Sequence, residues 1–107
     1  MWRPEVIADV TGNVRNHLPD VLTGVPANRT LGLVQAGGDG KSHFRGFGRT
    51  VSAQAVGHNG AKGQIAWGDP ATGLSFGYCT NGLDEHAIRE ARRTTALASL
   101  AALCAVS

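Results

Sequence analysis

The sequence lacks the runs and residue clusters that mark several classes of small protein. Its N-terminus has no apolar run of the kind that forms a secretory signal. The apolar stretch over residues 96–106 is about half the length that a membrane span needs, so we expect no membrane partner. Charged residues make up only 17% of the chain, and the net charge is +2. So small a charge gives no strong electrostatic case for a nucleic-acid partner.

Only two cysteines, Cys79 and Cys104, are present among the 107 residues. They form no CxxC pair and have no zinc-ligand spacing with the histidines. We expect two buried thiols in a reducing, cytoplasmic compartment, with a disulfide between them as the alternative. The chain also lacks the phosphate-binding P-loop, the HExxH zinc motif, the strand-to-helix GxGxxG loop and the Gly-x-Ser-x-Gly elbow. We therefore expect neither a metal nor a cofactor.

Glycine, in contrast, is abundant. Most of the 15 glycines lie between Gly24 and Gly82, whereas the last quarter of the chain has neither glycine nor proline and is rich in alanine and leucine. This shift marks a boundary between elements and not between domains, because neither side could bury a core alone. We predict a single domain, residues 1–107, of the α+β class. Its antiparallel sheet would have about three strands, one of them over residues 30–35, with a long C-terminal helix packed on the sheet.

A β-hairpin is the clearest local structure that the sequence predicts. Residues 64–68 and 74–80 have the composition of strands. The connection over residues 69–73, Asp-Pro-Ala-Thr-Gly, has the residue types that β-turns favour. Trp67 and Phe76 are expected in the core beneath this sheet and not on a substrate platform.

Two helices are predicted, one at each end of the chain. Residues 4–10 begin with a proline that suits a first turn, and a glycine follows as a stop. The long helix is expected over residues 84–106, opened by acidic residues that the helix dipole favours. Glu85 and Arg89 are spaced for an ion pair, and Arg92 and Arg93 are expected on a solvated face.

His58 is the residue of this glycine-rich region with the most chemical potential. It lies in the sequence Gly57-His58-Asn59-Gly60, and a glycine-dense strand lets a ligand approach the backbone closely. A histidine there can act as a general base, as a hydrogen-bond donor to a substrate, or simply as a loop residue. The residues around it do not decide among these roles.

The order of residues from 57 to 82 resembles the C-terminal part of serine β-lactamase-like hydrolases, which include class C β-lactamases and penicillin-binding-protein-like esterases. Many esterase-type members carry His-x-Gly where the β-lactamases carry Lys-Thr-Gly. A small residue, a strand, an Asp-Pro-x-Thr-Gly turn and a strand ending in Asn follow this motif. The matching parts here are His58-Asn59-Gly60, Ala61, residues 64–68, residues 69–73 and residues 74–81.

The resemblance implies an acyl-transfer site in which a serine attacks an ester or amide carbonyl. It assigns catalytic roles to His58, which would support the proton network, and to Ala61, whose N–H would be an oxyanion donor. Asn59 and Gly60 would bind substrate, the former by a polar contact and the latter by letting the acyl group approach. The implied substrate is a small-molecule ester or a β-lactam, and a histidine in place of the lysine favours the ester.

The family's Ser-x-x-Lys and tyrosine motifs have no counterpart in this sequence. No serine has a lysine three positions later, and the single tyrosine, Tyr78, is followed by Cys-Thr and not by x-Asn. In the family these motifs lie N-terminal to His-x-Gly. We therefore expect a C-terminal fragment whose partner is the missing N-terminal part of the domain, and we expect no meaningful activity from the chain alone.

Two other functions fit the sequence. A sheet-and-helix module could bind a partner through an unpaired edge strand without catalysing any reaction. The loop over residues 37–48 carries Lys41, His43 and Arg45 between small or aromatic residues. If that loop bound nucleic acid, the affinity would fall steeply with salt concentration.

Overall fold

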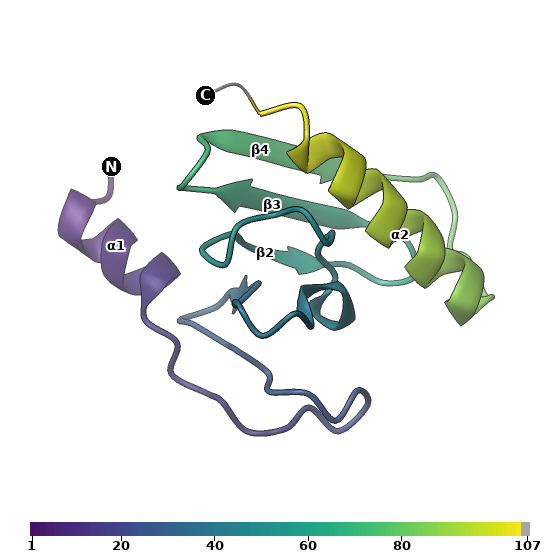
Figure 1. Ribbon diagram of the computed structural model, residues 1–107, viewed down its shortest axis with the longest axis horizontal. Coiled ribbons are helices and arrows are strands. Elements are labelled where there is room, and N and C mark those ends of the chain that lie inside the picture. The colour runs from purple at the N-terminus through teal and green to yellow at the C-terminus, as the bar shows by residue number, and fades with distance from the viewer. Residues whose placement is uncertain (106–107) are drawn as a thin grey trace.

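A computed structural model describes residues 1–105 and shows a four-stranded antiparallel sheet with one long helix on one face (Figure 1). The strands follow one another across the sheet in the order β1-β2-β3-β4. The α+β class and the C-terminal helix are as predicted, and the sheet has one strand more than the expected three. The elements in chain order are α1 (Pro4–Gly12), β1 (Val34–Gln35), the 3-10 helix η1 (Ser42–Arg45), β2 (Val56–Asn59), β3 (Ile65–Asp69), β4 (Leu74–Tyr78) and α2 (Ala87–Ala102).

The predicted hairpin is confirmed as β3 and β4, which pair Trp67 with Phe76 and Asp69 with Leu74. Asp69 organises the turn because its side-chain Oδ1 accepts from Ala71 N at 3.0 Å and its carbonyl accepts from Gly73 N at 2.8 Å. Gly73 has a φ of 75°, a left-handed conformation that glycine adopts without strain. These contacts explain why the Asp-Pro-Ala-Thr-Gly sequence gives a turn here.

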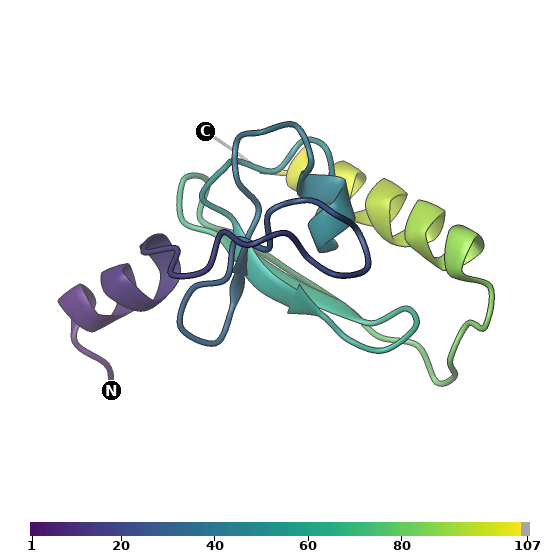
Figure 2. The same cartoon turned by 90° about the horizontal axis from the view of Figure 1, so that it is seen from below.

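The two faces of the sheet differ in the size of their side chains. On one face Ile65 and Trp67 are buried in the core with Ala98 of α2, and Phe76 packs against them. The expectation that Trp67 and Phe76 belong to the core is therefore confirmed. The other face presents small, exposed residues such as Ala66 and Gly77. Figure 2 shows α2 and η1 on the same side of the sheet.

A close backbone contact joins α2 to the loop before β2. Gly48 lies so near the backbone of Ala98 and Ser99 that a Cβ atom at position 48 would have no room. Ser99 Oγ accepts from Arg49 N at 2.8 Å, and Ser99 O accepts from Thr50 Oγ1 at 2.6 Å. The loop that carries η1 is thereby held against the middle of the helix.

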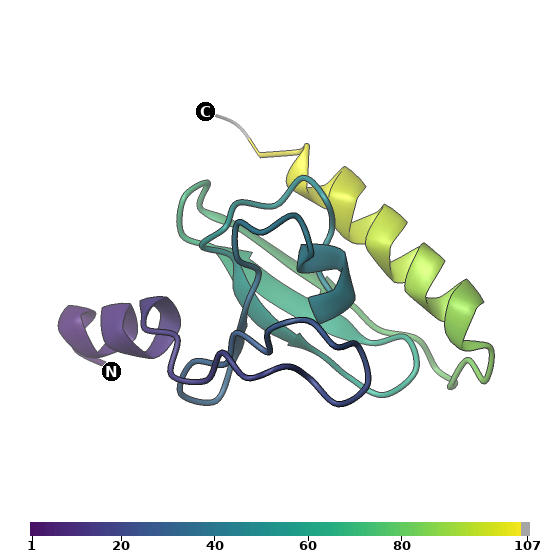
Figure 3. The same cartoon turned by 60° about the horizontal axis from the view of Figure 1, so that its bottom comes forward.

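The helix α1 extends away from the sheet, as Figure 3 shows, and has no buried residue. It confirms the helix predicted over residues 4–10. The exposed Arg15–Asp9 pair, with 2.6 Å between Nη2 and Oδ2, joins its last turn to the segment that follows. No helix in residues 1–105 is both long and apolar enough to cross a membrane.

Three local predictions are corrected by the structure. Residues 30–35 form a strand only at Val34–Gln35, because Gly32, with a φ of 91°, bends the chain into a turn. Cys79 and Cys104 are exposed free thiols and not buried ones, since each follows the end of its element. The long helix begins at Ala87, three residues later than predicted, and ends at Ala102, short of the predicted residue 106; Val106 itself lies outside the described residues.

Candidate functional site

His58 lies exposed at the end of β2, on the face of the sheet opposite α2. Its Nδ1 is 2.6 Å from the carbonyl oxygen of Asn59. A carbonyl oxygen can only accept a hydrogen bond, so Nδ1 carries the proton of the neutral ring. The other ring nitrogen, Nε2, is then left as an acceptor, which is the form that a general base requires.

The backbone beside His58 forms an unpaired stretch of sheet edge. Gly60 N donates to Gln64 O at 2.7 Å, so by the antiparallel alternation His58 also exchanges hydrogen bonds with Ala66. The amide group of Asn59 therefore points away from β3. The strand on that side, β1, ends where Val34 pairs with Gly57. The Asn59 N–H thus projects beyond the last strand pair.

A cleft of about 220 Å³ borders this edge and is called here the His58 cleft. His58 and Asn59 line it, and Asp20 and Arg29 add charged groups of opposite sign. Its remaining wall is mostly apolar and comes from the loop before β1, from β1 and from η1. The apolar residues are Leu22, Val25, Pro26, Ala27, Val34 and Phe44.

The buried side chain of Arg45 fixes the wall of the His58 cleft. Its Nε donates to Pro26 O at 2.8 Å, and its Nη1 donates to Ala36 O at 2.7 Å. Its two terminal nitrogens also donate to the carboxylate of Asp39, at 2.9 and 2.6 Å. The hydrogen bonds from Arg45 hold the pKa of Asp39 well below its usual range. Sequence reasoning missed this role, and the contacts leave Arg45 unavailable for a nucleic acid.

Of the residues singled out from the sequence, His58 and Asn59 line the cleft, whereas Gly60 and Ala61 lie in the turn that follows and do not. Ala61 is exposed, and its N–H donates no hydrogen bond within residues 1–105. The next residue, Lys62, has a φ of 53°. The four residues are consecutive along the edge, but one cleft does not gather all of them.

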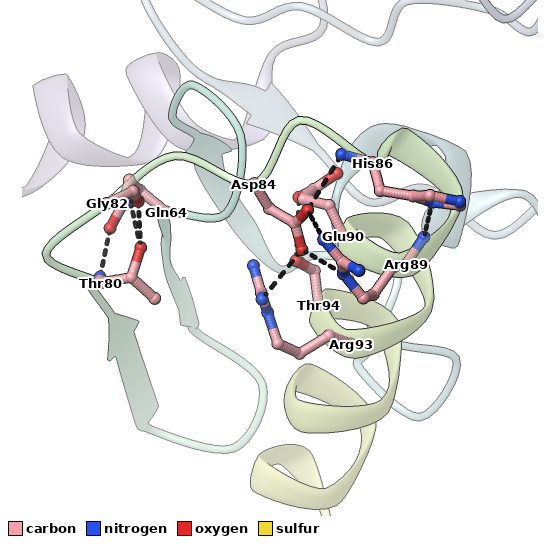
Figure 4. Close-up of polar contacts among 9 residues, drawn as sticks. All are labelled: Gln64, Thr80, Gly82, Asp84, His86, Arg89, Glu90, Arg93 and Thr94. Carbon is pink, nitrogen blue, oxygen red and sulfur yellow. Dashed lines mark hydrogen bonds and ion pairs between the residues drawn. The ribbon is translucent and has the colours of Figure 1, made fainter.

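Long-range polar contacts anchor that turn to the end of β4 and to the segment before α2; Figure 4 shows those between Gln64 and Thr80. Gln64 and Thr80 exchange two hydrogen bonds, from Gln64 Nε2 to Thr80 Oγ1 and from Thr80 N to Gln64 Oε1, both at 2.7 Å. Lys62 O accepts from Asp84 N at 3.1 Å. Lys62 Nζ is 2.8 Å from Glu85 Oε2, so Glu85 pairs with Lys62 and not with Arg89 as the spacing suggested.

Asp84 forms the centre of the polar cluster at the start of α2 (Figure 4). Arg89 donates to both of its oxygens, at 3.0 and 2.7 Å, and Arg93 Nη1 donates at 3.3 Å. These contacts, with a backbone hydrogen bond from His86, hold the pKa of Asp84 well below its usual range. Arg93 is half-buried over the Tyr78 ring, which corrects the prediction that it lies on a solvated helix face. Arg92 is exposed as expected.

Among residues 1–105, no group of three His, Cys, Asp or Glu side chains could hold a metal ion. Comparison with protein-family models, with curated proteins and with solved structures finds no match to this chain.

Proposed function

We propose that this chain supplies one wall of an acyl-transfer site of the serine β-lactamase-like type, acting on a small ester or, less favoured, a β-lactam. The attacking serine and its lysine would come from other sequence, as would the tyrosine of the motif. The observation that carries the proposal is the placement of His58, which is exposed at an unpaired strand edge and borders a small, mostly apolar cleft. A buried His58 side chain, or backbone amides hydrogen-bonded to strands on both sides of β2, would have argued against the proposal.

The chemistry assigned to each residue follows from this placement. The hydrogen bond to Asn59 O orients the His58 ring and leaves Nε2 to accept a proton within the network that activates the serine. The Asn59 amide, which points away from β3, and the Ala61 N–H, which donates no hydrogen bond within residues 1–105, would face the reacting carbonyl. One oxyanion donor is typically worth about 3 kcal/mol. The proton taken from the serine would end on the departing alcohol. Gly60 would leave the backbone accessible to the acyl group.

A nitrophenyl-ester assay tests what the chain does by itself. A positioned histidine without a nucleophile cannot form an acyl-enzyme. We therefore expect the chain and its His58→Ala variant both to hydrolyse the ester no faster than buffer alone. Robust turnover abolished by His58→Ala would refute the claim that the chain lacks its own catalyst.

The coding sequence upstream of Met1 tests the assignment to the family. We expect it to encode Ser-x-x-Lys and a Tyr-x-Asn or Tyr-x-Ser motif. A protein that includes those motifs should be labelled on its serine by a fluorophosphonate ester, and His58→Ala should slow the labelling. Absence of both motifs, together with no labelling of the longer protein, would contradict the proposal.

The second candidate is a module that binds a partner by adding a strand to its sheet. The observation that favours it is β4, which forms one edge of the sheet along all five of its residues. The backbone N–H and C=O groups of β3 residues 65, 67 and 69 point toward β4, where they pair with residues 78, 76 and 74. The backbone amides of Ser75 and Gly77 therefore point away from β3, toward the open side of the sheet. The strand carries no lysine and no proline, the residues that often block edge pairing.

A further inference from the structure

A second cleft lies between η1 and α2, on the other side of Phe44 from the His58 cleft. It also has a volume of about 220 Å³, well beyond the roughly 10–15 Å³ that one water molecule needs. The two clefts share Thr23, Phe44 and Asn59, so the Phe44 ring and the Asn59 side chain border both. The second cleft is defined here by His43, Phe44, Asn59, Glu90, Thr94 and Thr95.

Glu90 carries the one formal charge among the residues that line the second cleft. Its Oε1 accepts from Thr94 Oγ1 at 3.0 Å, and it forms no salt bridge with any residue between 1 and 105. The neighbouring arginines of α2, Arg89 and Arg93, are engaged by Asp84. Glu90 therefore lines the cleft without a salt-bridge partner among the described residues.

His43 adds no positive charge to the cleft at neutral pH. Burial lowers the pKa of His43, and the nearby charge of Arg49 lowers it further. The ring lies against Phe44, with 4.3 Å between the ring centroids. The cleft thus presents an aromatic pair and a carboxylate that has no salt-bridge partner among residues 1–105.

This combination selects the chemistry of a ligand. An anion would be repelled by Glu90, and a wholly apolar group would bury that charge with only the Thr94 hydroxyl as its partner. A cation is attracted both by the carboxylate and by the negative face of an aromatic ring. Phe44 is 52% exposed, so its ring is accessible to a ligand.

We propose that the second cleft binds the ammonium group of a small organic cation, with Glu90 as its counter-charge and Phe44 as its aromatic wall. The site goes beyond the proposed acyl-transfer role, because it requires neither a nucleophile nor an ester. The shared wall at Phe44 and Asn59 would let the remainder of such a ligand extend into the His58 cleft.

Titration of the ¹⁵N-labelled chain with choline, followed by amide chemical shifts, tests the proposal. We expect shifts at Phe44, Asn59, Thr94 and Thr95. The uncharged isostere 3,3-dimethyl-1-butanol should bind at least about tenfold more weakly, because it has the same shape but no charge. Equal affinity for the two compounds, or choline shifts confined to other residues, would overturn the proposal.

Variants then assign the effect to the cleft. Glu90→Gln keeps the shape and the acceptor for Thr94 but removes the charge, so choline affinity should again fall at least about tenfold. Glu5→Gln on α1 is the matched control and should leave the affinity unchanged. A Glu90→Gln protein that binds choline as tightly as the unaltered chain would contradict the site. No ester is present in these titrations, so their result is independent of whether His58 supports acyl transfer.

Discussion

Arg45 is the residue on which the geometry of the His58 cleft most depends. Its guanidinium is buried and joins the loop at Pro26 to the stretch between Ala36 and Asp39. The Pro26 contact holds the loop that forms the apolar wall against the start of the sheet. A charged side chain in the interior is costly unless its hydrogen bonds are made, and here they are.

Replacing Arg45 with methionine should lower the free energy of unfolding by about 2–3 kcal/mol, because two carbonyls lose their donor. Urea denaturation followed by circular dichroism measures the change. Arg92→Met is the matched control, since Arg92 is exposed, and it should shift stability by no more than about 0.5 kcal/mol. Similar losses in both variants would show that Arg45 does not act through these contacts.

At the scale of elements, the sequence predicted the helices and strands whose formation depends on residues close together in the chain. The β3–β4 hairpin follows from Asp69 and Gly73 within one turn, and α1 follows from its proline start. The start of α2 was misplaced, because Asp84 points its carboxylate at Arg89 and Arg93 and stays outside the helix. Helical spacing alone does not determine which arginine a carboxylate pairs with when the two residues are several positions apart in the sequence.

The N-cap of α2 was missed for a similar reason. His86 is an uncommon residue at this position, but its Nδ1 accepts from Arg89 N at 3.2 Å. Sequence analysis placed His58 in a glycine-dense strand, and β2 contains it. It could not foresee the cleft walls, since Pro26 and Phe44 are distant from His58 in sequence and long-range contacts such as Arg45 Nε to Pro26 O position them.

His86→Ala should destabilise the protein by about 1 kcal/mol through loss of the cap. His86→Asn should restore most of that stability, because asparagine is a favoured cap. Thermal unfolding followed at 222 nm compares the three proteins, and His17→Ala, at an exposed position, serves as the control. If the alanine and asparagine variants melt together, the side-chain cap does not contribute.

At the scale of the whole molecule, two carboxylates link the fold to pH. Asp39 and Asp84 both have pKa values lowered from 3.8 by arginine partners. The folded protein therefore releases these protons more readily than the unfolded chain, and the stabilisation is fully present above about pH 5, where both carboxyls are ionised even in the unfolded chain. It is lost progressively as the pH falls from there toward the lower pKa values of the folded state.

We therefore expect the urea midpoint to fall steadily between pH 5 and pH 2. Arg45→Met should flatten part of that dependence, because it removes the partner that lowers the pKa of Asp39. Denaturation curves at half-unit pH steps measure both slopes. Parallel curves for the variant and the unaltered protein would contradict a role for the Asp39 pair.

The open edge at β4 makes a prediction about association. If strand addition is the function, the chain should bind extended peptides or itself, and Gly77→Pro should abolish binding by removing an outward N–H. Light scattering after size exclusion, with the thermal midpoint as a folding control, measures this. A monomer that binds no strand-forming peptide at 100 µM would count against the module and leave the acyl-transfer proposal as it stands.

The two tryptophans occupy opposite environments, with Trp2 72% exposed just before α1 and Trp67 4% exposed beneath α2. Acrylamide should quench the red-shifted emission of Trp2 first, so that the remaining emission is blue-shifted and comes from Trp67. The chain thus carries two intrinsic fluorophores. Trp2 reports on the solvent near the N-terminal helix, and Trp67 reports on the packing of α2 against the sheet.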